Sequence, residues 1–337
     1  MGNSIKKYVY RMNIRENIIN NFLEEQGWPT AQITLLAGDA SNRKYFRVKN
    51  NTGRAILMDA PPNKEDVRPF IFFTNYLLEL GYSVPNIFAE NIKEGLLLLE
   101  DFGDNTFTQV LLQGIKEAEI YECAIDLLID LHKRPVIENR RDKIEFYSFQ
   151  KLYNEISLFV EWYMPLCFGI KTVIKNTEEF YSIWVNLFEN VSQINETLVL
   201  RDFHADNLVW LPEREGIKRC GLLDYQDAVI GSRTYDLLSL LEDARRDIMP
   251  EHKNHLMKRY LQAFPELDKE KFDATYHILA AQRHCKVLGI FSRLHARDNK
   301  DNYLAHLPRC WEMLKHSCLN PSLLELRNWL HSNMPTS

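Results

Sequence analysis

Hydrophobic residues recur with helical spacing at the start of the chain and with strand-like spacing after it. Residues 14–26 place isoleucine, phenylalanine and leucine three and four positions apart before Gly27, which predicts an amphipathic helix. A second helix is predicted over 65–80, between two groups of short apolar runs. Glycine, asparagine and proline separate these runs, which predict five strands, at 33–36, 45–48, 55–58, 86–89 and 96–99.

From Thr106 onward the apolar positions follow the longer period of helices. The predicted helices cover residues 106–133, 150–168, 177–194, 235–248, 252–263 and 271–293. Short β-type segments interrupt them at 197–200, 209–210 and 220–223. We therefore predict an α+β, bilobal fold: a small antiparallel β N-terminal lobe over 1–100, a hinge over 101–105 and a large, mainly helical C-terminal lobe over 106–337.

The composition is typical of a soluble globular protein and argues against several classes. Of 337 residues, 45% are hydrophobic and 26% are charged, and the net charge is −5. Without a clustered basic face, this charge argues against nucleic-acid binding. The six cysteines form no CxxC pair, and no apolar stretch has the length of a signal peptide or a membrane span. We therefore expect reduced thiols, no membrane association and a cytoplasmic location.

The candidate chemistry concentrates in residues 200–207, which read L-R-D-F-H-A-D-N between two apolar runs. Asp202 and Asn207 form a D-x-x-x-x-N pattern. Phosphoryl transfer needs a group that positions and deprotonates the acceptor hydroxyl, and oxygen ligands for a metal ion on the triphosphate. An aspartate and an asparagine five residues apart on one loop can supply both.

A third polar residue, Asp224, ends a short apolar strand seventeen residues after Asn207. Magnesium prefers oxygen ligands, and it usually takes only one or two from the protein, together with phosphate oxygens and water. Asp224 with Asn207 would provide that pair.

Together these residues resemble the aminoglycoside phosphotransferase family, which has a protein-kinase-like fold, and the resemblance covers nearly the whole chain. It implies ATP and Mg²⁺ as cofactors, Asp202 as the catalytic base, and Asn207 and Asp224 as metal ligands. Residues 127–132, L-L-I-D-L-H, are similar to a helix of the family. Asp236 stands where the family has an aspartate that supports the catalytic loop through its backbone, which implies a structural role.

The sequence departs from the family pattern at two places. The histidine and glycine that precede the catalytic aspartate in the family are Leu200 and Arg201 here. Met58 occupies the strand position where a phosphate-binding lysine is expected, so another cation must contact ATP. The candidates on the preceding strand are Arg43 and Lys44. Their possible acidic partners, near the following helix, are Glu65 and Asp66.

Two segments are predicted to hold the nucleotide. The loop before the second strand can bring backbone N–H groups to phosphate oxygens, and its predicted cofactor-binding residues are Gly38, Ser41, Asn42 and Arg43. The backbone at the hinge, at Glu100 and Phe102, is predicted to contact adenine. Asp101 begins a D-F-G triplet, but it precedes Asp202 by about a hundred residues, so we do not predict it to be a metal ligand.

A closer resemblance is to the anomeric sugar kinases of bacterial cell-wall recycling, which phosphorylate N-acetylmuramate and N-acetylglucosamine. The segments that carry it lie within 38–47, 58–62, 100–104, 201–205, 224–229, 241–247, 289–291 and 303–309. The resemblance implies an amino-sugar substrate phosphorylated at its anomeric hydroxyl. Because they share loops with the catalytic residues, His204, Gln226 and Asp227 are predicted to contact the sugar. His204 can equally be a structural histidine of the loop.

Several alternatives stay open. The guanidinium groups of Arg245 and Arg246 suit the lactyl carboxylate of muramate. The helix predicted over 235–248 would instead leave both in solvent, which the sequence favours. Competing functions are an aminoglycoside or other small-alcohol phosphotransferase and a nucleotide-binding pseudokinase or scaffold, for which Met58 is the main argument. The oligomeric state and the preferred sugar are left undetermined.

Overall fold

The chain forms two compact units. Its computed structural model describes residues 2–36, 42–51, 53–136, 138–168 and 177–334. Unit 1 contains Met1–Asn105 together with Gly221–Gln226, and unit 2 contains Thr106–Cys220 and Asp227–Ser337. Residues 101–105 thus belong to unit 1, and their role as a hinge stays a prediction. Among the described helices, none has both the length and the apolar character that crossing a membrane requires.

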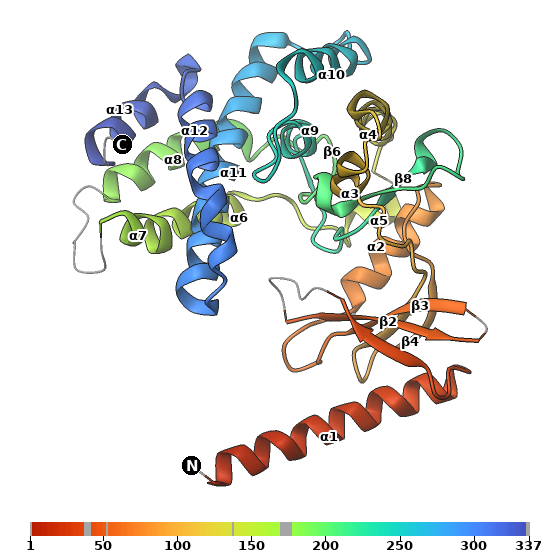
Figure 1. Cartoon of the computed structure of the whole chain (residues 1–337). Helices are drawn as coiled ribbons and strands as arrows, with labels where there is room; N and C mark the ends of the chain where they lie inside the picture. The colour runs from red at the N-terminus through yellow and green to blue at the C-terminus, as the bar shows by residue number, and fades with distance from the viewer. Residues whose placement is uncertain (1, 37–41, 52, 137, 169–176, 335–337) are drawn as a thin grey trace. The chain divides into compact units, whose positions relative to one another are not determined.

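Unit 1 is built on a five-stranded antiparallel sheet (Figure 1). Its strands, in spatial order, are β1 (Gln32–Leu35), β2 (Lys44–Asn50), β3 (Gly53–Asp59), β5 (Leu96–Leu99) and β4 (Ile87–Asn91). Two helices accompany them, α1 (Gly2–Glu25) and α2 (Arg68–Glu79). The five predicted strands and the helix between the two groups of strands are confirmed, with bounds that differ by a few residues.

One face of this sheet packs against α1. Side chains that alternate along the strands meet the apolar side of the helix in a core of buried residues, which are Ile19, Phe22, Leu23, Val48, Ala55, Leu57, Leu96 and Leu98. Because successive side chains of a strand point to opposite faces, Met58 lies on the other face. It is fully buried there, next to its strand partners Tyr45 and Leu97.

The segment Gly221–Gln226 is held in unit 1 by α2 and the turn after it. The hydroxyls of Tyr225 and Thr74 are hydrogen-bonded at 2.7 Å, and the Tyr225 ring stacks on Phe70 with 5.3 Å between centroids. The amide of Leu222 donates to the carbonyl of Ser83 at 2.8 Å. These contacts fix the backbone on both sides of Asp224.

Unit 2 is mainly helical. Its helices are α3 (Phe107–Leu112), α4 (Glu117–Lys133), α5 (Glu138–Arg141), α6 (Phe149–Leu158), α7 (Met164–Phe168), α8 (Thr177–Val191), α9 (Thr234–Leu241), α10 (Pro250–Gln262), α11 (Lys269–Asp298), α12 (Leu307–Ser317) and α13 (Leu324–Asn333). The short strands β6 (Thr197–Val199) and β9 (Val229–Gly231) pair antiparallel. Strand β7 (Leu208–Trp210) follows the loop that carries Asp202. Strand β8 (Cys220–Leu222), most of which belongs to unit 1, precedes Asp224.

The long helix α11 is the centre of unit 2, where it packs on α6, α9 and α12 (Figure 1). It begins at Asp268, whose side chain accepts hydrogen bonds from the amides of Glu270 and Lys271. Gly289 allows a close approach to α6, because a Cβ atom at this position would lie 2.4 Å from the Leu158 carbonyl carbon.

Two predicted helices of unit 2 are wrong in extent. The helix predicted over 106–133 is two helices, separated at Gly114, which has a φ of +92°. The helix predicted over 150–168 is confirmed in extent, because α6, a π-helical turn at Phe159–Tyr163 and α7 follow one another without a break. The one predicted over 235–248 ends at Leu241, because the Asp243 carboxylate instead accepts hydrogen bonds from the backbone outside the helix.

Candidate active site

The loop between β6 and β7 carries Asp202. A buried aspartate is hydrogen-bonded to the backbone of the first two residues of this loop. Asp236, in the first turn of α9, is fully buried and accepts hydrogen bonds from the amides of Leu200 at 2.6 Å and Arg201 at 2.8 Å. Burial raises the pKa of Asp236 to about 7, although the two backbone hydrogen bonds act in the opposite direction. The conformation of the loop thus depends on a side chain from a distant part of the sequence.

Arg201 has a backbone conformation that normally favours glycine. Its φ is +71°, and a left-handed conformation costs a residue with a Cβ atom about 1–2 kcal/mol. The family pattern has glycine at this position, and the backbone geometry explains why. Here the side chain compensates, since it pairs with Glu155, donates to the Asp227 carbonyl at 3.3 Å and lies over the Tyr147 ring at 5.5 Å.

Glu155, on α6, is the hub of a buried charge network around this loop. Its carboxylate binds Arg201 and lies 3.0 Å from the Lys286 Nζ atom. It also accepts hydrogen bonds from Gln282 at 2.7 Å and Tyr147 at 2.5 Å. Burial alone would raise the pKa of Glu155, but the charges of Lys286 and Arg201 outweigh burial and lower it to about 2. The carboxylate is therefore ionised at neutral pH.

Asp202 lies beside the cations of this network. Its side chain is 33% exposed, and its Oδ1 atom is 3.7 Å from the Nη1 atom of Arg283, which also donates to the Arg201 carbonyl at 3.0 Å. Burial would raise the pKa of Asp202, but the positive charges of Lys286, Arg283 and Arg201 prevail and hold it well below its usual range. Asp202 is thus an ionised, partly accessible carboxylate that can accept a hydrogen bond from a hydroxyl.

Asn207 and His204 are oriented by the same loop. The Asn207 Nδ2 atom donates to the Asp202 carbonyl at 3.0 Å and lies 3.3 Å from His204 Nε2. Because the amide nitrogen is directed toward the loop, the amide oxygen is directed away from it. His204 is buried, and within the described residues its Nδ1 atom has no hydrogen-bond partner.

The imidazole of His204 is neutral at physiological pH. Burial lowers the pKa of this side chain, and the charges of Arg245 and Arg283 act in the same direction. The carboxylates of Asp243 and Asp202 oppose this effect without reversing it. A neutral imidazole can accept as well as donate a hydrogen bond.

Asp224, in unit 1, also has a left-handed backbone, with a φ of +57°. Its Oδ1 atom accepts a hydrogen bond from the side-chain Nε2 atom of Gln226 at 2.7 Å, and Gln226 is itself buried. This contact orients the carboxylate. Asp227, the first residue of the following part of unit 2, is exposed. Sugar contacts from Gln226 and Asp227 stay predictions.

Two of the predicted site residues carry oxygen donors of the type that a hard metal ion prefers. Within the part of the chain that the structure describes, no group of three or more His, Cys, Asp and Glu side chains is arranged to hold a metal. Magnesium does not need such a group, because phosphate and water oxygens complete its shell. Asn207, in unit 2, and Asp224, in unit 1, carry oxygen donors of the required type.

On the nucleotide side, Arg43 has an acidic partner. Its Nε atom lies 3.1 Å from Glu65 Oε2, and both side chains are largely buried. The other oxygen of Glu65 accepts from the amide of Asn42 at 3.1 Å. Glu65 thus links two of the predicted cofactor-binding residues. The other two residues predicted on this loop, Gly38 and Ser41, lie outside the described residues.

The D-F-G triplet is a structural element of unit 1. The Asp101 carboxylate is only 2% exposed and binds Arg47 at 2.8 Å and Arg54 at 3.4 Å. It also accepts from the Gly103 amide, whose φ is +81°. A carboxylate with two arginine partners is poorly suited to bind a metal, in agreement with the prediction for Asp101.

Glu100 is hydrogen-bonded to Asn86, in the segment of unit 1 that precedes β4. Its amide donates to the Asn86 carbonyl at 2.8 Å, and its carboxylate accepts from the Asn86 side chain at 2.5 Å. The predicted contacts of Glu100 and Phe102 with adenine are not tested by these hydrogen bonds.

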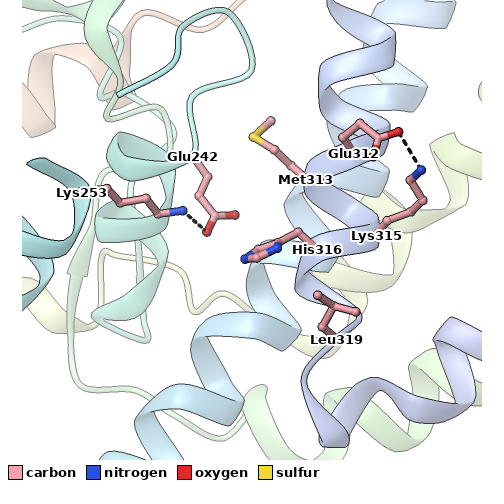
Figure 2. Close-up of a pocket in the computed structure, with 7 residues that line it drawn as sticks. All are labelled: Glu242, Lys253, Glu312, Met313, Lys315, His316 and Leu319. Atoms are coloured by element: carbon pink, nitrogen blue, oxygen red, sulfur yellow. Dashed lines mark hydrogen bonds and ion pairs between the residues drawn. The ribbon is translucent and has the colours of Figure 1, made fainter. Parts of the chain in front are cut away.

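A separate cavity of about 540 Å³ is lined by Glu242 and by residues of α12, and none of its lining residues is a predicted site residue (Figure 2). Figure 2 shows the Glu242 carboxylate bonded to Lys253, with His316 of α12 nearby. Glu242 also binds His284 at 2.8 Å and the Tyr276 hydroxyl at 3.0 Å. Its carboxylate is thus engaged within the protein, and we assign this cluster a structural role.

Sequence reasoning missed the residues that surround Asp202. Glu155, Arg283 and Lys286 lie 47, 81 and 84 residues from Asp202 in the sequence, and no local motif includes them. One sequence feature could have indicated them: the middle turns of α11 have polar residues among the apolar ones, which is unusual for a helix in the core. These polar residues, all buried, are Gln282, Arg283, His284 and Lys286.

Comparisons with known proteins give matches over most of the chain. Residues 32–274 match the model of the phosphotransferase enzyme family. The chain is 34% identical to the N-acetylmuramate/N-acetylglucosamine kinase of Caulobacter vibrioides, with 93% of this chain and 95% of that protein covered. It is 32% identical to the protein of the same name from Pseudomonas aeruginosa, with 91% of each covered.

Solved structures show the same fold at low sequence identity. The choline kinase LicA from Streptococcus pneumoniae matches with a TM-score of 0.62 and 15% identity, over 89% of this chain and 99% of that one. An ADP-bound aminoglycoside phosphotransferase, APH(2'')-Ib, matches with a TM-score of 0.58 and 16% identity, over 88% and 98%. The predicted protein-kinase-like fold is thereby confirmed.

Proposed function

Because the chain belongs to the phosphotransferase enzyme family, we propose that it phosphorylates the anomeric hydroxyl of N-acetylmuramate and N-acetylglucosamine at the expense of ATP. The observation that carries this proposal is the similarity to the Caulobacter vibrioides kinase, which extends over 93% of the chain. An ionised, partly exposed Asp202 on a rigidly held loop provides the chemistry that such a reaction needs.

In the proposed reaction, the Asp202 carboxylate accepts a hydrogen bond from the anomeric hydroxyl and orients its oxygen toward the γ-phosphorus. A bond forms between this oxygen and phosphorus while the bond from phosphorus to the β–γ bridging oxygen breaks. ADP leaves, and the hydroxyl proton passes to Asp202. The low pKa of Asp202 suits this role, because phosphoryl transfer relies more on positioning than on a strong base.

Mg²⁺ is proposed as the metal, with Asn207 and Asp224 as its protein ligands. When bound, it would neutralise charge on the phosphate oxygens. The hydrogen bond from the Asn207 Nδ2 atom to the Asp202 carbonyl fixes the orientation of the Asn207 side chain. The hydrogen bond from the Gln226 side chain orients the Asp224 carboxylate.

Arg43 is proposed as the cation that replaces the lysine missing at Met58. Its ion pair with Glu65 would fix the guanidinium in one orientation, as an acid on the following segment does for a phosphate-binding lysine. We further propose that Asn42 and the neighbouring residues Gly38 and Ser41 contact the phosphates, and that the backbone at Glu100 and Phe102 contacts adenine.

The sugar contacts are proposed to come from His204, Gln226 and Asp227. Of these, His204 has the most direct support, because its buried Nδ1 atom has no hydrogen-bond partner among the described residues. Small molecules would be the partners, and a cytoplasmic location would give access to ATP.

The test is a substrate panel with purified protein, ATP and Mg²⁺. N-Acetylmuramate, N-acetylglucosamine and kanamycin are offered separately, and ADP release is measured. We expect turnover of the two amino sugars. Turnover of kanamycin alone would overturn the substrate assignment, and ATP binding without any turnover would favour a pseudokinase.

Asp202→Asn tests the chemical role. We expect kcat to fall by about 10²–10⁴-fold while ATP binding, measured by calorimetry, is retained. The matched control is Asp142→Asn, at an exposed position outside the loop. Wild-type turnover by Asp202→Asn would show that Asp202 is not the base.

A further inference from the structure

Arg245 lies on an irregular segment that is tied directly to the catalytic loop. Helix α9 ends at Leu241, so the helical pattern does not determine where the Arg245 side chain points. The carboxylate of buried Asp243 accepts hydrogen bonds from the Arg245 amide at 2.9 Å and, more weakly, from the Ala205 amide at 3.4 Å. One side chain therefore joins the backbone of Arg245 to the residue that follows His204.

The head group of Arg245 lies over an aromatic cluster. Its guanidinium carbon is 5.4 Å from the centroid of the Phe291 ring, on α11. The Phe291 ring in turn contacts Tyr303 at 5.0 Å and His306 at 5.8 Å between centroids. Aromatic rings next to a cation provide both an apolar surface for the C–H groups of a sugar and a charge for an anionic substituent.

The acidic partner of Arg245 is one that a ligand can replace. Arg245 Nε lies 3.5 Å from Asp206 Oδ2, and these side chains are 31% and 41% exposed. Such exposed pairs contribute little to stability. Asp206 also accepts a hydrogen bond from Thr108 at 2.5 Å, so it would keep a partner if the guanidinium turned to a ligand.

The other cations around the loop are committed to the protein. Arg201 and Lys286 bind Glu155, and Arg283 donates to the Arg201 carbonyl. Arg309 donates to the backbone carbonyls of Asp243 at 3.0 Å and Arg246 at 2.7 Å. Each of these cations makes a contact of 3.0 Å or shorter, whereas the Arg245 Nε atom lies 3.5 Å from its acidic partner.

Arg245 and Asp202 also act on the same side chain. Arg245 lowers the pKa of His204, whereas Asp202 acts in the opposite direction, so both charges lie within electrostatic reach of this ring. The His204 Nδ1 atom is buried and has no hydrogen-bond partner among the described residues. The buried His204 Nδ1 atom is therefore a polar group beside the loop that a ligand can satisfy.

We propose that Arg245 forms a carboxylate subsite beside the catalytic loop, and that it binds the lactyl carboxylate of N-acetylmuramate. The inference rests on the proposed function. The two amino sugars share the anomeric hydroxyl and the acetamido group, but only the muramate carries an acid, on the oxygen of C3. A guanidinium forms strong paired hydrogen bonds with a carboxylate. Arg245 therefore determines preference between the two sugars without taking part in the transfer.

The experiment measures kcat/KM for three substrates: N-acetylmuramate, its neutral lactyl carboxamide and N-acetylglucosamine. The variants are Arg245→Met, Arg245→Lys and the neighbouring control Arg246→Met, since Arg246 is directed toward Glu117 instead. Thermal unfolding of each variant verifies folding. The acid and its carboxamide together with Arg245→Met form a thermodynamic cycle, which isolates the contact between guanidinium and carboxylate.

For the wild type we expect the acid to be preferred over the carboxamide by about tenfold to a hundredfold, as for a hydrogen bond between charged groups. Arg245→Met is expected to abolish this preference. It should also lower kcat/KM for N-acetylmuramate, relative to kcat/KM for N-acetylglucosamine, by a similar factor. Arg245→Lys should retain part of the preference, and Arg246→Met all of it.

Equal loss on all three substrates in Arg245→Met would overturn the subsite, as would a wild type that does not distinguish acid from carboxamide. The comparison of acid with carboxamide requires no mutation, so the absence of a preference in the wild type would overturn the subsite even if a variant failed to fold, and Arg245→Lys provides a second, conservative variant. If the wild type phosphorylates neither sugar, the proposed function itself is wrong. The two failures are therefore distinguishable.

Discussion

Glu155→Gln tests whether the buried carboxylate at the centre of the charge network stabilises unit 2. Gln has nearly the same shape but no charge, so Arg201 and Lys286 lose their anionic partner while little volume changes. Holding the pKa of Glu155 at about 2, instead of its ordinary 4.5, corresponds to about 3 kcal/mol at neutral pH. Breaking a buried ion pair by removing one partner costs about 3–5 kcal/mol, which agrees with this value.

The assay is thermal unfolding followed by circular dichroism, as a function of pH. At pH 7, about 3 kcal/mol corresponds to a decrease in Tm of about 6–12 °C for a domain of this size. Because the folded pKa lies below the unfolded one, the stabilisation is fully present above about pH 4.5 and is lost as pH falls toward 2. The difference between wild type and variant should therefore shrink over this interval.

The control is Glu161→Gln, which makes the same chemical change at an exposed position of the adjacent turn. We expect its Tm to stay within about 1–2 °C of the wild type, since surface substitutions have small effects. If Glu155→Gln behaved like this control, or if its deficit did not depend on pH between 5 and 3, the network would not stabilise the fold as reasoned.

Three further predictions follow from the contacts described. Arg43→Met should raise KM for ATP by about tenfold or more, and Glu65→Gln should have a smaller effect in the same direction, measured by steady-state kinetics. Arg201→Gly should destabilise the protein by about 2 kcal/mol despite relief of the left-handed backbone, and less so in combination with Glu155→Gln, as a double-mutant cycle in urea would show. Glu242→Gln should lower stability by about 3 kcal/mol without changing KM for ATP, because its partners lie in a separate cluster.

Much of the fold was predictable because it depends on local patterns. The antiparallel strands of unit 1 have β-type residues between turn residues, and the helices of unit 2 have apolar residues at helical spacing. The errors occurred where a contact overrides the pattern. The helix that was expected to continue to residue 248 ends at Leu241, because the Asp243 side chain bonds the backbone of two other segments.

In the candidate site, too, some residues follow from local patterns and others depend on tertiary contacts. Asp202, Asn207 and Asp224 were predicted because their spacing along the chain reflects the two loops that carry them. Arg43 was one of two candidate cations, and its ion pair with Glu65 distinguishes it from Lys44. No sequence pattern could make this distinction, since which side chains meet across a hairpin and the following segment depends on packing.

The sequence by itself therefore determined the family, the order of helices and strands, and the candidate residues for phosphoryl transfer, because these depend on short segments and their spacing. Only the tertiary structure decided which charges surround Asp202. Glu155 and the cations of α11 are distant in sequence, and they meet because α6 and α11 pack together, with Gly289 allowing their close approach. Electrostatic effects depend on distance in space, so they become visible only once the chain is folded.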